Sequence, residues 1–475
     1  MILDGLHPHQ AEYVPWLLQR PKALLAWEPG VGKTAALLRA WEVSRERGPA
    51  LVICLATARE NWRREIRKFA LDPDWPPRVH TVNTNHASPT VDPKADIVIV
   101  NYDKLLNERI ANDLGLVRWG VIILDEAHAL KTPTAKRTMR FYGNPRKKSL
   151  KPLMQASDRI WLATGTPMPN HPGELYSHCS HLWPEHMQYR GHVMEQWEFE
   201  AAFCQMQMTD YGVTVIIGGR NLGELKARLA PVVSVIKRKE VLDLPPLVIE
   251  TWALSADTIP QTKYAPRTPN VPGLLGTLEE RYGSIGDIDR FDAATLDAYL
   301  ACIESAMLPM ASVRRETAQL KAVYTGLLIA EEIDEDGQKT VVFAHHREAL
   351  ATLAQTLKRF NPAIIHGDVP QGRRQAEIDR FQNDPKCKVF IGQITAAGAS
   401  INLQAASKVI FVEASWVPGE NEQAYARVYR MGQNKSVWVR FVYLPDSIDE
   451  AVSRALARKV VMIEGVFGKM ESKAS

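Results

Sequence analysis

Short runs of consecutive hydrophobic residues alternate along the chain with segments in which hydrophobic and polar residues recur at helical spacing. In the first half, the runs lie at residues 51–56, 97–101, 121–124 and 160–163, and residues 61–69 have the pattern of a basic amphipathic helix. Strands without a polar face are typical of parallel sheets that helices cover on both sides. The pattern therefore predicts an α/β fold with a mostly parallel sheet.

A second series of hydrophobic runs predicts a second α/β half. These runs lie at residues 340–344, 363–365, 388–391, 409–412 and 437–442. Between the two series, residues 173–229 have a longer, helical pattern, and residues 255–270 are rich in Pro, Thr and Ser and predict a loop. Residues 292–307 and 314–332 predict helices, and residues 447–470 predict one or two amphipathic helices that pack on the second half. Two such halves are more than one nucleotide-binding fold requires.

Composition narrows the class of protein without deciding it. A chain of 475 residues can hold two to three domains, and 45% hydrophobic and 24% charged residues are ordinary for a globular protein. No apolar stretch is long enough for a membrane span, and the start lacks the order of a secretion signal. The five cysteines show no metal-binding spacing, so free thiols are expected rather than zinc or disulfides. A net charge of +4 permits a nucleic-acid partner but does not establish one.

A glycine loop follows a short hydrophobic run at residues 23–26 and leads into a helical pattern. Its sequence, Gly-Val-Gly-Lys-Thr, lets backbone N–H groups approach phosphate oxygens, and the helix N-terminus favours their negative charge. Lys33 would reach the β- and γ-phosphates, and Thr34 would hold Mg²⁺. The general pattern has glycine where this chain has Trp27. The residues predicted to bind nucleotide in this loop are Gly30, Gly32, Lys33 and Thr34.

Two adjacent carboxylates, Asp125 and Glu126, follow the hydrophobic run at residues 121–124. This is the carboxyl end of a predicted strand, where ligands bind in open α/β sheets. Alone, such a pair is more often a solvated turn. Beside a glycine loop, it is what hydrolysis of a nucleoside triphosphate needs: Asp125 would hold Mg²⁺, directly or through water, and Glu126 would polarise the attacking water.

Other candidate residues depend on this context. Thr164, Gly165 and Thr166 follow the run at residues 160–163, where hydroxyl groups could sense the γ-phosphate. Gln10 offers a donor and an acceptor that suit an adenine edge, although a lone glutamine before a helix is otherwise uninformative.

The second half carries a complementary set. Arg427 and Arg430 are spaced three apart, which predicts that both lie on one face of a helix. Such arginines are more often a solvated surface, but opposite a phosphate loop they become candidate arginine fingers. The small-residue loop at residues 395–403 would let a sugar-phosphate backbone come close.

Together and in this order, these segments resemble the Swi/Snf family of ATP-driven double-stranded DNA translocases, within superfamily two of the helicases. The resemblance covers residues 1–250 and 312–455. Residues 314–317 and 343–346 look especially like the annealing-helicase (HARP-type) branch. The segments similar to family motifs are residues 6–10, 28–34, 61–62, 101–102, 125–128 (the DEAH form of motif II), 131–132, 164–170, 366–367, 398–403, 416–418 and 423–433.

The resemblance implies two RecA-like lobes with parallel sheets flanked by helices, helical insertions between them, and ATP with Mg²⁺ in the cleft. Lobe one would span residues 1–236, with an insertion at about 172–232. Residues 237–325 would form a brace, linker and helical insertion, and residues 326–475 would form lobe two with a C-terminal helix. The catalytic residues would be Lys33, Glu126, Arg427 and Arg430. The residues that couple the nucleotide to the DNA grip would be His128, Thr164, Gly165, Thr166 and Gln423.

The family also implies sequence-independent contacts with duplex DNA. Residues 237–239 resemble its inter-lobe basic brace, and residues 146–148 are either another phosphate contact or a solvated loop. The predicted DNA contacts are Arg59, Asn61, Lys131, His366, Thr395, Gly398 and Trp416.

Some residues depart from the family pattern. Trp27 replaces the usual acid and Pro29 the usual Met, which would reshape the adenine side of the pocket. Val417 replaces the usual Asn, Tyr429 the usual His, and Thr132 the usual Asn. None of these changes removes a residue expected to act in hydrolysis.

The resemblance therefore predicts a monomeric motor on fork, branched or plain duplex DNA, acting in replication or repair. The lack of chromatin-binding extensions favours a compact bacterial or viral protein, in the bacterial cytoplasm or an infected host cell, over a chromatin remodeller. Two alternatives stay open: a strand-separating DEAH-type DNA or RNA helicase, and a non-catalytic DNA-binding scaffold.

Overall fold

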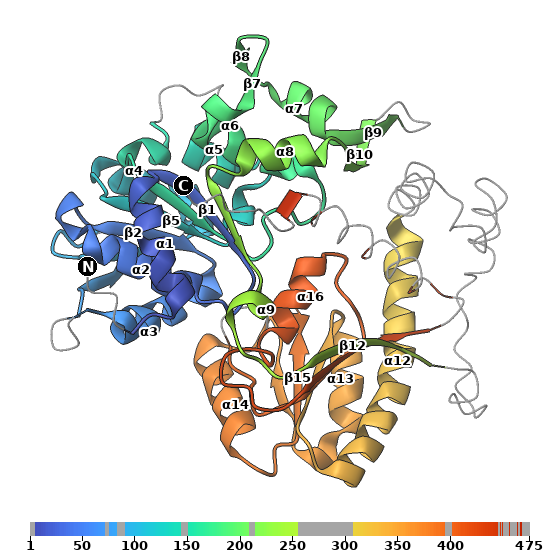
Figure 1. The fold of residues 1–475 in the computed structure, drawn as a ribbon. Helices are drawn as coiled ribbons and strands as arrows, with labels where there is room; N and C mark the ends of the chain where they lie inside the picture. The colour runs from blue at the N-terminus through green and yellow to red at the C-terminus, as the bar shows by residue number, and fades with distance from the viewer. Residues whose placement is uncertain are drawn as a thin grey trace. The chain divides into compact units, whose positions relative to one another are not determined.

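The computed structural model describes residues 5–71, 76–82, 91–143, 151–208, 214–254, 307–394 and 401–444, together with residues 447, 449, 456, 463, 466 and 467. The chain divides into two compact units. The first comprises Met1–Phe203, Asn221–Leu242 and Ile463–Ser475, and the second comprises Cys204–Arg220 and Asp243–Met462. Each unit contains a parallel sheet flanked by helices (Figure 1), which confirms the predicted α/β class.

The sheet of the first unit has seven parallel strands in the order β11-β1-β6-β5-β2-β4-β3. β2 and β4 are buried at every position, as strands covered on both faces must be. β6 lies between β1 and β5, so the segments that follow these three strands meet at one edge of the sheet. The strands are β1 (Lys22–Trp27), β2 (Ala50–Cys54), β3 (Val79–Thr81), β4 (Ile97–Asn101), β5 (Val121–Asp125), β6 (Ile160–Ala163) and β11 (Val233–Ile236).

Helices cover this sheet and follow its strands. On α3, Trp62 and Ile66 are buried while Arg64 and Arg67 are exposed, which confirms the predicted amphipathic helix. The α-helices are α1 (Pro8–Gln19), α2 (Lys33–Val43), α3 (Arg59–Phe69), α4 (Glu108–Leu116), α5 (Lys136–Tyr142), α6 (Tyr176–Leu182), α7 (Gln196–Phe203), α8 (Leu222–Leu229) and α9 (Arg238–Val241). The 3-10 helices are η1 (Arg45–Arg47), η2 (Ala56–Ala58), η3 (Tyr102–Leu106), η4 (Ala127–Leu130), η5 (Leu153–Ala156), η6 (Pro172–Leu175) and η7 (Pro184–Met187).

The helical pattern predicted for residues 173–229 is confirmed only in part, because short helices alternate there with two antiparallel hairpins. One hairpin pairs β7 (Gln188–Tyr189) with β8 (His192–Val193), and the other pairs β9 (Cys204–Met208) with β10 (Thr214–Gly219). The physical reason lies in the local sequence: Cys-Gln-Met-Gln-Met alternates with a period of two, and Thr-Val-Ile-Ile is rich in β-branched residues.

The second unit has a six-stranded parallel sheet in the order β12-β17-β16-β13-β15-β14. The predicted helix at residues 314–332 is confirmed and extends over the whole of α12. The sequence did not predict the edge strand β12, which pairs with β17 along its full length. The elements are β12 (Leu247–Ala253), α12 (Met307–Asp336), β13 (Thr340–Ala344), α13 (Arg347–Thr356), η10 (Lys358–Phe360), β14 (Ala363–Ile365), α14 (Gln371–Asn383), β15 (Val389–Gln393), β16 (Lys408–Phe411), α16 (Pro418–Tyr425) and β17 (Val437–Tyr443).

Several predicted segments lie outside the described residues. They are residues 255–270, residues 292–306 and most of residues 447–470. Within the described part of the chain, no helix combines the length and the apolar character that crossing a membrane requires.

Candidate nucleotide site and the polar junction of the second unit

The phosphate loop lies between β1 and α2, as the sequence predicts. Gly30 has φ 88° and Gly32 has φ 89°, in the left-handed region that favours glycine. A Cβ atom at Gly32 would lie 2.0 Å from the Nε2 atom of Gln10, so only glycine fits beside this amide. The loop that leads into α2, which begins at Lys33, therefore has no side chain at Gly30 or Gly32.

The Lys33 side chain curls over the phosphate loop. Its Nζ atom donates to the backbone oxygen of Trp27 at 2.7 Å and to that of Glu28 at 3.3 Å. The same ammonium group favours the charged forms of Asp125 and Glu126, so it lies near both carboxylates. A cation held at the centre of this loop is the arrangement that a polyphosphate requires.

Gln10 packs on the phosphate loop from α1. Its Oε1 atom accepts from the His7 backbone N–H at 2.9 Å, and its Nε2 atom donates to the oxygens of Val31 at 3.3 Å and Gly32 at 3.4 Å. His9, which the sequence analysis did not single out, contacts the Val31 oxygen through Nε2 at 2.9 Å. These bonds tie α1 to the phosphate loop.

Trp27 is a core residue that faces α1 and β11. Its side chain is fully buried, and its indole N–H donates to the Ser234 hydroxyl at 2.8 Å. Its ring packs edge-on against the rings of His9 and Tyr13. The residue that departs from the family pattern at this position therefore forms part of the contact between α1 and the sheet.

The acidic pair stands at the carboxyl end of β5, and Glu126 adopts left-handed backbone angles of φ 50° and ψ 55°. The indole N–H of Trp62, on α3, donates to Oδ2 of Asp125 at 2.7 Å. The Thr164 hydroxyl donates to Oε2 of Glu126 at 3.0 Å. Trp62 was noted only as part of a segment similar to a family motif, and its bond to Asp125 has no signal in the sequence.

The two carboxylates have opposite pKa shifts. Burial and the adjacent Glu126 charge raise the pKa of Asp125 to about 6. Burial also acts to raise the pKa of Glu126, but His128, Lys33 and the Thr164 hydroxyl outweigh it and lower the pKa to about 2. Glu126 is therefore fully ionised at neutral pH, and its carboxylate can accept a hydrogen bond from an attacking water.

The turn after β6 contacts both the acidic pair and the phosphate loop. The Nδ1 atom of His128 lies 3.0 Å from the Thr164 hydroxyl oxygen and 3.2 Å from that of Thr166. A Cβ atom at Gly165 would meet the Pro29 ring at 2.9 Å. The structure therefore brings together the four residues of the first unit that were predicted to couple nucleotide and DNA.

The predicted DNA-contact residues of the first unit lie on two elements. Arg59 begins α3, and its Nε atom donates to the Ala56 oxygen at 3.2 Å, while Asn61 is partly buried on the same helix. Lys131 follows η4, and its Nζ atom pairs with Oε1 of the buried Glu174 at 2.5 Å. The basic loop at residues 146–148 lies outside the described residues.

The prediction that Arg427 and Arg430 share a helical face is wrong. α16 ends at Tyr425, and both arginines lie in the turns that follow it. The chain there is held by other bonds: the Arg427 oxygen accepts from the Leu403 N–H at 2.9 Å, and Nη1 of Arg430 lies 3.5 Å from the Ile401 oxygen.

The other predicted residues of the second unit occupy separate elements. Gln423 lies on α16, and His366 follows β14, where its oxygen accepts from the Val369 N–H at 3.1 Å. The Arg314 guanidinium lies 5.5 Å from the ring centre of Trp416. Thr395 and Gly398 fall outside the part of the chain that the structure describes.

A polar junction joins the two segments that resemble the annealing-helicase branch. Glu413, after β16, accepts through Oε2 from the N–H groups of His345 and His346, both at 2.9 Å, and through Oε1 from Nδ1 of His346 at 2.7 Å. Arg314, from α12, lies 3.9 Å from Oε1 and donates to the Ala414 oxygen at 2.8 Å. Glu413 was not predicted as part of a site, because nothing in its local sequence marks it.

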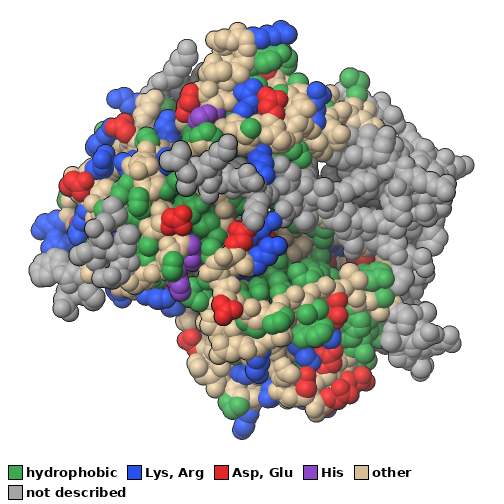
Figure 2. Space-filling model, in the orientation of Figure 1, with side chains coloured by type: hydrophobic (Ala, Val, Ile, Leu, Met, Phe, Trp, Pro, Cys, Tyr) green, Lys and Arg blue, Asp and Glu red, His purple; other side chains and the backbone are tan. Residues whose placement is uncertain are grey.

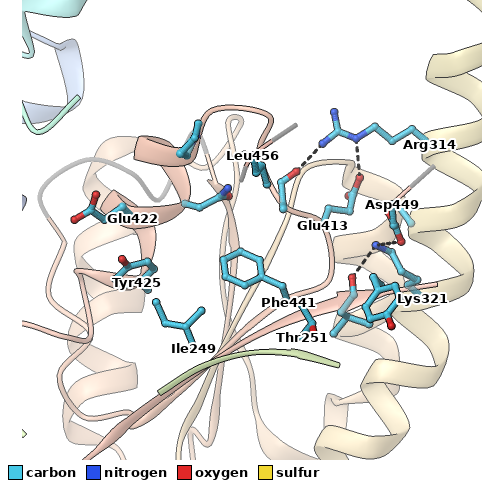
Figure 3. Close-up of a pocket in the computed structure, with 16 residues that line it drawn as sticks. Ile249, Thr251, Arg314, Lys321, Glu413, Glu422, Tyr425, Phe441, Asp449 and Leu456 are labelled. Atoms are coloured by element: carbon cyan, nitrogen blue, oxygen red, sulfur yellow. Dashed lines mark hydrogen bonds and ion pairs between the residues drawn. The ribbon is translucent and has the colours of Figure 1, made fainter. Parts of the chain in front are cut away.

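Beside this junction, the second unit contains a cavity of about 450 Å³ (Figure 3). Arg314 and Glu413 lie at one end, and the buried Lys321 bonds Asp449 at 2.7 Å and the Val442 oxygen at 3.1 Å. Apolar side chains such as Phe441 line much of the rest. None of the residues predicted to bind ATP lines this cavity.

Two parallel α/β units, with a phosphate loop beside a DEAH-type acidic pair in the first, define an enzyme of the helicase-like ATPase class. The chain belongs to the SNF2 family. Residues 9–248 match the SNF2-related domain, and residues 322–432 match the helicase conserved C-terminal domain. This confirms the resemblance to the Swi/Snf family of superfamily two.

Individual relatives are distant. The DNA annealing helicase and endonuclease ZRANB3 of Mus musculus is 25% identical over 96% of this chain and 40% of its own length. The SWI/SNF-related matrix-associated actin-dependent regulator of chromatin subfamily A-like protein 1 of Drosophila melanogaster is 26% identical over 100% of this chain and 58% of its own length. The chain thus spans less than two thirds of the length of these relatives.

Among solved structures, the Sulfolobus solfataricus SWI2/SNF2 ATPase core in complex with dsDNA is similar at 21% identity and a TM-score of 0.42. The match covers 98% of this chain and 94% of the other.

Proposed function

We propose that this chain hydrolyses ATP between two RecA-like lobes and thereby translocates on double-stranded DNA, in fork processing, replication or repair. The observation that carries the proposal is the site in the first unit, where the phosphate loop, the acidic pair and the threonine turn converge at one edge of the sheet. The names of the relatives, which include a DNA annealing helicase, support DNA as the partner.

Five residues of the first unit carry the proposed binding and hydrolysis of the nucleotide. Lys33 binds the β- and γ-phosphates. Its ammonium group already lies at the phosphate loop, where it donates to the backbone oxygens of Trp27 and Glu28. Thr34 and Asp125 hold Mg²⁺, because a hydroxyl, a carboxylate and phosphate oxygens are the ligands this ion prefers, and it supplies charge neutralisation when bound. Glu126 polarises the attacking water, and Gln10 reads the adenine.

The second unit supplies the proposed charge that stabilises the transferred phosphoryl group. Arg427 and Arg430 act as arginine fingers. Because ATP would be held from both lobes, its binding favours a closed cleft, and hydrolysis releases it. The proposed lobes span residues 1–236 and 326–475, with the brace, linker and insertion at residues 237–325.

DNA contacts would be made to the phosphate backbone and would therefore be independent of sequence and sensitive to salt. Coupling passes from the nucleotide to these contacts through His128, the threonine turn and Gln423. The proposed contact residues are Arg59, Asn61, Lys131, His366, Thr395, Gly398 and Trp416.

An ATPase assay with and without nucleic acid tests this proposal. Duplex DNA should stimulate hydrolysis more than RNA does, and Lys33→Ala and Glu126→Gln should each abolish the stimulated rate. The matched controls are Lys94→Ala and Glu185→Gln, which remove the same charges from exposed positions and should leave the rate unchanged.

The alternatives give different results. Stronger stimulation by RNA would indicate an RNA helicase, and the absence of any hydrolysis by the wild-type protein would indicate a scaffold. Triplex displacement without strand unwinding is the outcome expected of a translocase, whereas unwinding would indicate a strand-separating helicase.

A further inference from the structure

The backbone of Glu126 is held in an unusual conformation. Its left-handed angles are rare for any residue with a Cβ atom, and they persist only where the surroundings fix them. The main chain turns sharply here because β5 ends and η4 begins immediately after this residue. The direction of the Glu126 carboxylate therefore depends on what holds the two neighbouring peptide groups.

The peptide group before Glu126 is held by Tyr102. This side chain is only 2% exposed, and its hydroxyl donates to the backbone oxygen of Asp125 at 2.8 Å. Tyr102 lies in η3, directly after β4, and β2 separates β4 from β5 in the sheet. The phenol therefore reaches past the end of β2, close to the buried Cys54, to contact the strand that carries the acidic pair.

The residue after Glu126 is held by His178 of α6. This buried ring forms a hydrogen bond with the Ala127 backbone, and its Nδ1 atom lies 2.6 Å from the hydroxyl oxygen of the buried Tyr142. Burial lowers the pKa of His178 to about 3, so the ring is neutral. A neutral ring can satisfy both contacts, because one of its nitrogens donates and the other accepts.

We propose that Tyr102 and His178 are positioning residues for ATP hydrolysis, which fix the left-handed turn at Glu126 by holding the carbonyl groups of Asp125 and Ala127. Neither side chain contacts nucleotide; each acts through Glu126. The inference rests on the proposed function and adds to it the means by which the fold aims the carboxylate. Tyr102 thus has a structural assignment distinct from the predicted motif at residues 101–102.

The test removes single hydroxyl groups and separates catalysis from binding. In Tyr102→Phe, kcat should fall roughly 10- to 100-fold, because a displacement of about 1 Å at a reacting group costs up to about 10²-fold in rate. The KM for ATP and the affinity for a non-hydrolysable ATP analogue should stay within about twofold of wild type, since the phosphate loop is untouched.

Two further variants make the result decisive. Tyr324→Phe removes the hydroxyl of another buried tyrosine, on α12 of the second unit, and should leave kcat unchanged. His178→Gln keeps an amide donor for Ala127 and should retain more activity than His178→Leu, which has none. If Tyr102→Phe does not fold, the comparison of the two His178 variants tests the positioning role.

Failure of the inference differs from failure of the proposed function. An unchanged kcat in Tyr102→Phe, or a fall in kcat matched by an equal loss of analogue affinity, would overturn the positioning role while leaving wild-type hydrolysis intact. No hydrolysis by the wild type, or full activity in Glu126→Gln, would overturn the proposed function itself.

Discussion

At the scale of single residues, the nucleotide site contains positions where neighbouring side chains lie so close to the backbone that only glycine fits. The space beside Gly32 is filled by the amide of Gln10, and the space beside Gly165 by the ring of Pro29. The phosphate loop is thereby packed between α1 and the turn after β6. A change of one methyl group in this region alters the loop and its neighbours together.

Substituting Gly32 tests this packing. In Gly32→Ala, the added Cβ must displace the Gln10 amide and also adopt φ +89°, so the protein should lose more than about 1 kcal/mol of stability and bind ATP more weakly. Gly191→Ala is the matched control, because Gly191 has φ +87° but open space around its Cα. Thermal unfolding and titration with a fluorescent ATP analogue measure both effects. Equal losses in the two variants would show that strain alone is responsible.

The sequence predicted the site residues that belong to a recognisable local pattern. The glycine loop, the acidic pair and the threonine turn each follow a hydrophobic run, and the structure brings them together because parallel strands end at one edge of a sheet. Trp62, Tyr102 and His178 could not be predicted in their observed contacts. Each contacts the acidic pair or the residue after it from an element whose neighbours depend on strand order, which no local spacing encodes.

At the scale of elements, most predicted strands are confirmed, and the differences have local causes. The interior strands are continuous hydrophobic runs, which the sequence displays directly. β12 was missed because an edge strand is only half buried, so its hydrophobic signal is weak. The arginine pair was placed on a helix because its spacing fits one, but α16 ends two residues before Arg427.

The junction at Glu413 ties several elements of the second unit together, and its charge should matter for stability. Burial acts to raise the pKa of Glu413, but hydrogen bonds from His346 and His345 outweigh it and lower the pKa from 4.5 to about 2. The Nε atom of Arg314 lies 3.9 Å from Oε1 of the same carboxylate. A shift of this size corresponds to about 3 kcal/mol, which is present above pH 4.5 and is lost as the pH falls towards 2.

We therefore expect Glu413→Gln to lower the Tm at neutral pH by an amount that shrinks as the pH is lowered from about 4.5 towards 2. Unfolding monitored by circular dichroism across this range measures the difference between the two proteins. Glu335→Gln, at an exposed position of α12, the helix that carries Arg314, should match wild type throughout. A difference that stays constant with pH would show that the Glu413 charge does not contribute.

At the scale of the whole molecule, each unit has its own sheet and its own core, and the proposed reaction needs both. The first unit holds the phosphate loop and the acidic pair, whereas Arg427 and Arg430 belong to the second. The separate roles of the two units can be tested by substituting one predicted catalytic residue at a time. Loss of a first-unit residue and loss of a second-unit residue should affect different steps.

Arg430→Ala should leave ATP binding largely intact while DNA-stimulated hydrolysis falls on the order of 10³-fold or more, because an arginine finger acts mainly on the transition state. Analogue binding and steady-state ATPase rates, measured side by side, separate the two quantities. Arg359→Ala, which removes an exposed arginine of the same unit paired with Asp334, serves as the control. Weakened ATP binding with an unchanged turnover rate would assign Arg430 a binding role instead.

The place of β12 has a practical consequence for dissecting this motor. The strand comes from residues that precede the segment 255–306, yet it forms the outer border of the second sheet and is joined to its neighbour by an ion pair between Glu250 and Arg440 at 2.6 Å. A fragment that starts at residue 326 would lack β12. The main-chain N–H and C=O groups of β17 that pair with β12 would then be exposed, and they could pair with a second copy of the fragment. A cut made ahead of Leu247 keeps the border in place.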